Sequence, residues 1–232
     1  MPIRAAKYLS GFRCIAAVCA FFVAASATAS DWQLEVDQDN IKLFTRQGEA
    51  SPMKTYKVET RIKATLSSLV AFLNDEKSFP KWMDKVAEVE KIRDINEQES
   101  LVYQVIDAPW PAKDQDNILY SKWTQDPNTL AVTKDITAEP MFMKEKSNRR
   151  RQSFYKASWT LIPEGNGMVK VEYSAEIDPG VGEVKEWMEK MLAFDMPFKT
   201  IRNFRRANLD NYAGNKFAFI QEPSRSELVM AE

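Results

Sequence analysis

Strict alternation of apolar and polar side chains marks the middle of the chain. In residues 54–62 the even positions, from Tyr56 to Ile62, share one face, and the odd positions are mainly charged. Residues 169–177 repeat the pattern more cleanly, with apolar side chains at every odd position. A period of two is typical of a strand with one buried and one solvated face, so both segments are predicted to be strands.

A hairpin partner and five weaker strands complete the expected sheet. Residues 154–162 are the predicted partner of 169–177, because the turn-forming sequence Pro-Glu-Gly-Asn-Gly joins them at 163–167. The weaker strands are expected at 41–46, 86–95, 100–107, 118–125 and 129–136. Short connections favour antiparallel pairing, so we expect about eight strands in a mainly antiparallel sheet.

Two stretches follow helical spacing instead. Residues 67–74 are mainly apolar after a polar cap, and a short turn is expected at 78–83. Apolar residues recur three and four positions apart over 182–212, which predicts one long helix that Pro197 should kink. The pattern therefore predicts an α+β domain in which a long helix lies across a curved sheet. The tail, residues 213–232, is expected to be loosely attached.

Composition narrows the function classes. Of the 232 residues, 44% are hydrophobic and 28% are charged, which is ordinary for a globular domain and unlike a disordered or polytopic membrane chain. The net charge of −1 provides no basic field that would attract nucleic acid. The sequence has no histidine, which excludes Ser-His-Asp and Cys-His catalysis and the commonest ligand of zinc, iron and copper. We therefore expect no cofactor and no metal.

The N-terminal segment has the features of an export signal. Basic residues precede an apolar run at 15–25, which is shorter than the ~20 residues that span a bilayer. An Ala-Thr-Ala cleavage site follows at 27–29, so residues 1–29 are predicted to be a signal peptide and Ser30 the mature N-terminus. The alternative is a retained interfacial helix. Both cysteines lie in this segment, and the expected location is periplasmic or secreted.

Six short motifs follow one another along the chain. They are Ile41 to Arg46; Asp75 with Pro80 and Trp82; Pro109-Trp110-Pro111 with Asp114 to Asp116; Arg151 to Trp159; Val171 to Tyr173 with Asp178-Pro179-Gly180; and Asp195, Pro197, Thr200, Ile201 and Arg205. Together they resemble the motifs of START domains, the StAR-related lipid-transfer family, over about Trp32 to Asn211. The sequence departs from the family at Gln115, where arginine is usual, and at Val181, where a second glycine is usual.

The resemblance implies a helix-grip fold, in which an antiparallel sheet grips a C-terminal helix around an apolar tunnel. Residues 30–212 would form this START-like lipid-binding domain. Composition alone favours a solid core, whereas the resemblance favours a tunnel wall and lid built from the large side chains, among which methionine is adaptable. The expected ligand-binding residues are Trp82, Tyr103, Trp110, Trp123, Phe142, Met143, Arg151, Trp159, Tyr173, Met188, Met191 and Leu192.

Three of these expectations concern particular segments. The loop at 109–116, stiffened by two prolines, is expected to act as a lid with Trp110 inserted, and a rigid surface turn is the alternative. The family match points Arg151 inward, toward a carboxylate at the tunnel floor that the sequence does not identify. The basic run at 144–156 could meet anionic lipid head groups, or it could be an ordinary solvated face.

The expected function is the binding and transport of a hydrophobic, lipid-like ligand by a monomer, with no covalent step. Phospholipid, sterol-like lipid, fatty acid and quinone all fit an apolar tunnel. Transient contact with a membrane surface is expected, and binding of nucleic acid is not. Two alternatives remain open: an enzyme like the polyketide cyclases and aromatases, acting on a chain held in the same cavity, and a pure interaction module.

Overall fold

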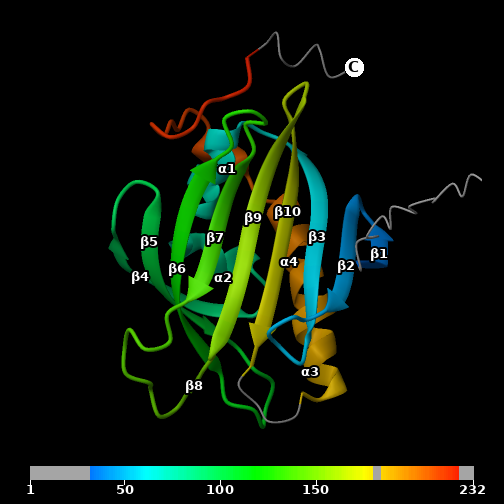
Figure 1. The fold of residues 1–232 in the computed structure, drawn as a ribbon, viewed down its shortest axis with the longest axis vertical. Helices are drawn as coiled ribbons and strands as arrows, with labels where there is room; N and C mark the ends of the chain where they lie inside the picture. The colour runs from blue at the N-terminus through cyan, green and yellow to red at the C-terminus, as the bar shows by residue number, and fades with distance from the viewer. Residues whose placement is uncertain (1–31, 180–183, 225–232) are drawn as a thin grey trace, which may run out of the picture. The chain divides into compact units, whose positions relative to one another are not determined.

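The computed structural model describes residues 32–179 and 184–224, which form one large sheet with helices packed against one side (Figure 1). Ten strands are present in these residues. They are β1 (Gln33–Gln38), β2 (Ile41–Gln47), β3 (Lys54–Lys63), β4 (Val86–Asp94), β5 (Glu99–Ile106), β6 (Gln115–Gln125), β7 (Val132–Ala138), β8 (Arg150–Arg151), β9 (Phe154–Gly165) and β10 (Met168–Asp178). All eight predicted strands are therefore present.

The strands are ordered β1-β2-β3-β10-β9-β7-β6-β5-β4, and neighbours along this path are antiparallel. The two-residue strand β8 is the exception, since it pairs in parallel with the start of β6. Sequence analysis missed β8 because two residues are too short for a period, and it missed β1, whose residues are at most half-buried at the sheet edge. The pairing of β3 with β10 brings the two ends of the domain together in the middle of the sheet.

The helical segments are α1 (Leu66–Leu73), η1 (Glu76–Ser78), α2 (Phe79–Trp82), α3 (Glu186–Lys190), η2 (Met191–Asp195), α4 (Met196–Arg205) and η3 (Leu209–Tyr212). Helices α1, α2 and α4 lie on the same side of the sheet (Figure 1). None of the helices in the described residues is long and apolar enough to cross a membrane.

The prediction of one kinked helix over 182–212 was partly wrong. Pro197 cannot donate a backbone hydrogen bond to the preceding turn, and that turn, η2, is a π-helix rather than a sharp kink. Helix α4 ends at Arg205, short of the predicted end. Asn208 accepts a hydrogen bond from the backbone N–H of Asp210 and so begins the separate turn η3, an example of a polar side chain that competes with helix continuation.

The buried face of the sheet is the one that alternation predicts. Val169, Val171, Tyr173, Ala175 and Ile177 of β10 are all buried. They pack with α1, α2 and α4 in one hydrophobic core, so the concave face of the sheet and the three helices enclose the interior of the domain.

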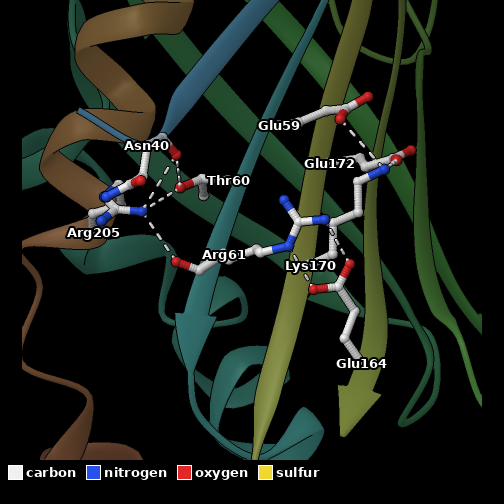
Figure 2. A network of polar contacts seen from close by, with 8 residues as sticks. All are labelled: Asn40, Glu59, Thr60, Arg61, Glu164, Lys170, Glu172 and Arg205. Atoms are coloured by element: carbon white, nitrogen blue, oxygen red, sulfur yellow. Dashed lines mark hydrogen bonds and ion pairs between the residues drawn. The ribbon is translucent and has the colours of Figure 1, made fainter. Parts of the chain in front are cut away.

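The C-terminal end of α4 is fastened to the sheet by Arg205. Its guanidinium donates hydrogen bonds to the Thr60 hydroxyl at 2.5 Å and to the Arg61 carbonyl at 3.0 Å (Figure 2). Closer to the start of α4, the Thr200 hydroxyl accepts a hydrogen bond from the backbone N–H of Asp84 at 3.0 Å. Thr200 and Arg205 belong to the last of the six motifs, so that motif anchors the helix to its surroundings.

The outer face beside this anchor is charged. Arg61 pairs with Glu164 at 2.6 Å, and Lys170 bridges Glu59 and Glu172 at 3.3 and 2.5 Å (Figure 2). The charged residues of β3 and β10 alternate with the buried ones, and Glu164 is contributed by the neighbouring strand β9, so this part of the sheet has one wet and one dry face.

The expectation of a loosely attached tail was wrong for residues 213–224. Phe217, Phe219 and Ile220 pack against the core. The Glu222 carboxylate accepts hydrogen bonds from the backbone N–H groups of Leu66 and Ser67, at 3.0 and 2.7 Å. These N–H groups have no partner inside a helix, so a carboxylate from a distant segment stabilises the start of α1. The predicted signal peptide, Val181 and residues 225–232 lie outside the described residues.

Candidate functional site

An inner cavity lies between the sheet and the helices, but it is small. Its volume, measured as the space open to the centre of a water-sized sphere, is about 30 Å³. The residues that line it are Leu73, Glu76, Phe79, Trp82, Met83, Val102, Gln104, Leu119, Ser121, Lys134, Ile136, Tyr155, Trp159 and Tyr173. Ligand pockets for small molecules are typically about 300–1,000 Å³. The expected open tunnel is therefore absent from the described residues, because aromatic side chains fill most of the space between sheet and helices.

The aromatic wall of the inner cavity is tightly ordered. Trp159 and Tyr173 stack with ring centroids 4.2 Å apart, and Trp82 meets Trp159 edge to face at 6.0 Å. The Tyr173 hydroxyl lies 3.1 Å from both the Tyr56 and the Tyr155 hydroxyls. Burial raises the pKa of all three phenols well above the ordinary value. The phenols therefore stay neutral and act as hydrogen-bonding groups rather than as bases at physiological pH.

One cation reaches the inner cavity. The Lys134 ammonium donates to the Leu73 carbonyl at 2.9 Å and to the Asn74 side-chain oxygen at 3.1 Å, and so binds the C-terminal end of α1. Burial lowers the pKa of Lys134 to about 8. Glu76 lines the same cavity and pairs with Lys91 at 3.2 Å.

A second, larger pocket opens between the loop after β5 and the helical segment that starts at α3. This mouth pocket has a volume of about 200 Å³. Its walls include Ile106, Ala108, Pro111 and Gln115 on one side and Trp187, Met188, Met191 and Leu192 on the other. The sequence predicted that this loop and these last residues would form a gate, and the structure brings them together around one pocket.

Tyr103 and Arg151 do not line either pocket, contrary to the prediction. Val102 and Gln104 face the inner cavity, so Tyr103, which lies between them on β5, faces the outer side of the sheet. Arg151 lies there too, in two hydrogen bonds to the Asp116 carboxylate at 2.9 and 3.0 Å. Arg151 therefore pairs with a carboxylate, as expected, but Asp116 lies on the outer side of the sheet rather than at a tunnel floor.

The polar groups of Arg151, Asp116 and Tyr103 find their hydrogen-bond partners within the protein, which indicates that this outer network has a structural role. Arg151 also donates to the carbonyls of Pro140 and Met143, at 2.8 and 3.1 Å, and Tyr103 donates to Asp116 at 3.0 Å. Burial alone would raise the pKa of Asp116, but the hydrogen bonds from Arg151 and Tyr103 outweigh burial and lower it. Arg151 fastens the loop after β7 to the sheet, and its guanidinium is not directed at the interior.

Three other predicted site residues are exposed. Trp110 is 93% exposed, so it is not inserted into the pocket that its neighbour Pro111 lines. Phe142 and Met143 are about half-exposed in the loop after β7, and this loop covers the outer face rather than the mouth.

Trp123 is buried in the core, where its indole N–H donates to the Asn74 side chain at 2.9 Å, and it does not line the inner cavity.

The predicted basic run is not a uniform solvated or membrane-facing patch. Arg151 is buried, and Arg149 donates to Glu88 at 2.8 Å and to the Tyr103 hydroxyl at 2.7 Å. Lys146 stacks over the ring of Tyr103 at 4.3 Å. These cations mainly hold the loop after β7 against the outer face of the sheet.

Sequence reasoning also missed residues that line the pockets. Gln104, Lys134 and Tyr155 face the inner cavity, and Gln115 lines the mouth pocket. Alternation along β5 and β9 could have placed Gln104 and Tyr155 on the inner face with Val102 and Trp159. The available signal is a polar residue on an otherwise apolar face, since such residues are the informative exceptions.

Comparison with known proteins agrees with this architecture. The START domain model matches residues 13–212. An uncharacterised protein of Pseudomonas aeruginosa is 29% identical over 193 residues, which cover 83% of this chain and 94% of that protein.

Two solved structures show the same fold. The structure of a STAR-related lipid transfer protein from Xanthomonas axonopodis, a fragment, is 28% identical, with a TM-score of 0.69 over 76% of this chain and 97% of that one. Human StAR-related lipid transfer protein 5 is 14% identical, with a TM-score of 0.65 over 80% and 88% of the two chains. The helix-grip fold expected from the motifs is confirmed, and the chain belongs to the START domain family.

Proposed function

We propose that the protein binds a hydrophobic, lipid-like molecule in its interior and carries it through water without a covalent step. The observation that supports this most directly is the presence of two spaces, lined mainly by apolar side chains, along β5 and β6. The mouth pocket opens beside Met188 and Leu192, and the inner cavity lies further along the same two strands, against α1 and α2. Shielding each CH₂ group from water contributes about 0.8 kcal/mol, so an enclosed lipid chain is stabilised nearly as well as in a bilayer.

Loading requires the interior to expand, and the anchoring contacts indicate where. Helix α4 is held at its middle by Thr200 and at its C-terminal end by Arg205, whereas α3 and η2 form one wall of the mouth pocket. The π-helical turn η2 and Pro197 lie between α3 and the anchored part of α4, and the regular helical hydrogen-bond ladder is interrupted there. Opening would therefore separate α3 from the loop after β5 while α4 stays in place, which lengthens the inner cavity toward the mouth.

The mouth pocket carries features suited to a membrane surface. Trp187, which lines the pocket, is 42% exposed, and Trp110, the neighbour of the lining residue Pro111, is 93% exposed. Tryptophan is favoured at the interface between lipid and water, so this end would contact the bilayer transiently during loading.

Export of the chain is part of the proposal. The protein would act in the periplasm or outside the cell after cleavage before Ser30. N-terminal sequencing of the protein from its host tests this directly, because a sequence starting at Met1 would contradict it.

A test of the carrier proposal compares the ligand before and after binding. Protein purified from its own host is analysed by native mass spectrometry, and any bound molecule is extracted and identified. The protein is then incubated with vesicles that contain the same molecule. A carrier should pick it up and release it with no change in mass. The alternative is an enzyme of the polyketide cyclase type, and turnover abolished by replacement of a single buried acid or tyrosine would establish that alternative.

A further inference from the structure

A group of buried side-chain amides lies where β6 passes from the lining of the mouth pocket, at Gln115, to that of the inner cavity, at Leu119. Gln115 lines the mouth pocket, and Gln104 lines the inner cavity. Asn117 lies directly opposite Gln104 in the pairing of β5 with β6. The parallel pairing of β8 with β6 continues through a hydrogen bond from the Gln152 backbone N–H to the Asp116 carbonyl, which brings Gln152 beside Asn117. We call these four residues the amide cluster.

The orientation of two of these amides is fixed by a backbone carbonyl. Pro179 O can only accept, so the Gln115 side-chain nitrogen donates to it, at 3.2 Å. The Gln115 oxygen therefore accepts from the Gln152 side-chain nitrogen, at 2.6 Å. The Gln152 side-chain oxygen is left over, and it has no hydrogen-bond partner among the described residues.

Asn117 is less satisfied still. Its side chain is fully buried, and neither its nitrogen nor its oxygen has a partner within residues 32–179 and 184–224. A buried amide without partners is costly, and native proteins contain few. Packing does not require a polar group here, since Leu119 occupies the next inward position of the same strand and packs in the core.

We propose that Asn117 and Gln152 form a head-group subsite for an uncharged ligand whose polar end both donates and accepts hydrogen bonds, such as a hydroxyl or an amide. This inference rests on the proposed function. The free atoms are one amide nitrogen and two amide oxygens. A hydroxyl or amide can donate to an oxygen and accept from the nitrogen, whereas an ester can only accept. A carboxylate would place its negative oxygens against two acceptors.

The test uses four probes with the same C18 chain: oleamide, oleyl alcohol, methyl oleate and oleate. Their affinities for the full-length mature chain are measured by displacement of one fluorescent fatty alcohol. Oleamide and oleyl alcohol should bind about tenfold more tightly than methyl oleate, the difference expected for one or two buried hydrogen bonds. Oleate should bind no better than methyl oleate at pH 8.

Two variants locate the preference, and a third is the matched control. Asn117→Leu and Gln152→Met keep the side-chain volume and remove the free amide atoms, although Gln152→Met also removes the donor to Gln115. Each should reduce the preference for oleamide severalfold while methyl oleate binds as before. Gln125→Met is the control, because Gln125 lies on the same strand with its amide bonded to Leu130 and Gln221. It should leave the preference unchanged.

Thermal stability without ligand gives an independent readout. Asn117→Leu should melt at the same or a higher temperature than the wild type, because it removes unpaired polar groups, whereas Gln125→Met should melt lower. A loss of stability in Asn117→Leu as large as in Gln125→Met would show that the amide is structural and overturn the proposal. Equal affinity for all four probes would overturn the subsite but leave lipid binding intact. A preference for oleate would also overturn it and point to Lys134. Failure of every probe to bind would refute lipid binding itself.

Discussion

Replacement of Arg151 separates a structural role from a ligand-binding one. Arg151 was expected to face the ligand, but the structure places it in the pair with Asp116, whose two side chains are only 3% and 1% exposed. Arg151→Met would leave the Asp116 carboxylate buried with only the Tyr103 hydroxyl as a side-chain donor. The loop after β7 would also lose the two hydrogen bonds that Arg151 donates to its carbonyls.

The magnitude follows from the burial of the pair. Removing one partner of a buried ion pair costs about 3–5 kcal/mol, because the remaining charge is uncompensated. In a domain of this size each kcal/mol lowers the melting temperature by about 2–4 °C, so the variant should melt about 6–20 °C below the wild type. Arg61→Met is the matched control, since the Arg61 side chain is 56% exposed in its pair with Glu164 and such a pair contributes about 1 kcal/mol or less.

The pH dependence provides the second measurement. In the wild type the pKa of Asp116 is lowered by Arg151 and Tyr103, so the stability it contributes is present at neutral pH and is lost only as the pH falls below the ordinary carboxylate range. Without Arg151, burial dominates and raises the pKa of Asp116. The carboxyl then takes up a proton on mild acidification, so the deficit of Arg151→Met should be smaller at pH 5 than at pH 7.

Calorimetry or urea unfolding at the two pH values, together with the double variant Asp116→Leu/Arg151→Met, completes the assay. The double variant should recover most of the lost stability, because no charge is left unpaired. A deficit below about 1 kcal/mol in Arg151→Met would refute the structural reading. So would a variant of near-normal stability that had lost ligand binding, since Arg151 would then act on the ligand after all.

Three further predictions concern the gate, the buried lysine and the tail. Cysteines placed at Ala108 and Met191, which line opposite sides of the mouth pocket, can form a disulfide if their Cα atoms come within ~7 Å. This disulfide should slow lipid loading and release in a vesicle transfer assay. Equal rates in the oxidised and reduced protein would exclude this gate. Because burial lowers the pKa of Lys134 to about 8, the folded state loses its proton before the unfolded state does, and wild-type stability should rise by about 2 kcal/mol relative to Lys134→Met between pH 8 and pH 10, measured by urea unfolding. A flat difference would contradict the lowered pKa. Glu222→Ala should destabilise the domain by about 1 kcal/mol, since it removes the carboxylate that receives two backbone N–H groups at the start of α1, and Glu222→Gln should restore part of the loss in the same unfolding assay.

The alternating pattern by itself determined the strands and their buried face. In β3 and β10 a period of two leaves one choice of inward residues, and burial follows it from Tyr56 to Thr60 and from Val169 to Ile177, with Thr55 and Glu176 as buried exceptions on the other face. The six motifs, read in order, determined the family and with it the helix-grip arrangement. Strand periodicity and short motifs can be recognised in the sequence, because each depends only on neighbours within a few residues.

Only the tertiary structure decided which side chains meet. Tyr103 and Trp159 are both aromatic and were both predicted to line the tunnel. Tyr103 instead faces outward, where it donates a hydrogen bond to Asp116, and Trp159 lines the inner cavity. The partner of Arg151 is 35 positions away, and the partners of Glu222 are more than 150 positions away. No local pattern specifies contacts at such separations. The size of the cavity was likewise undetermined, because the same aromatic residues can line a tunnel or fill it, and only their packing across the sheet and helices distinguishes the two.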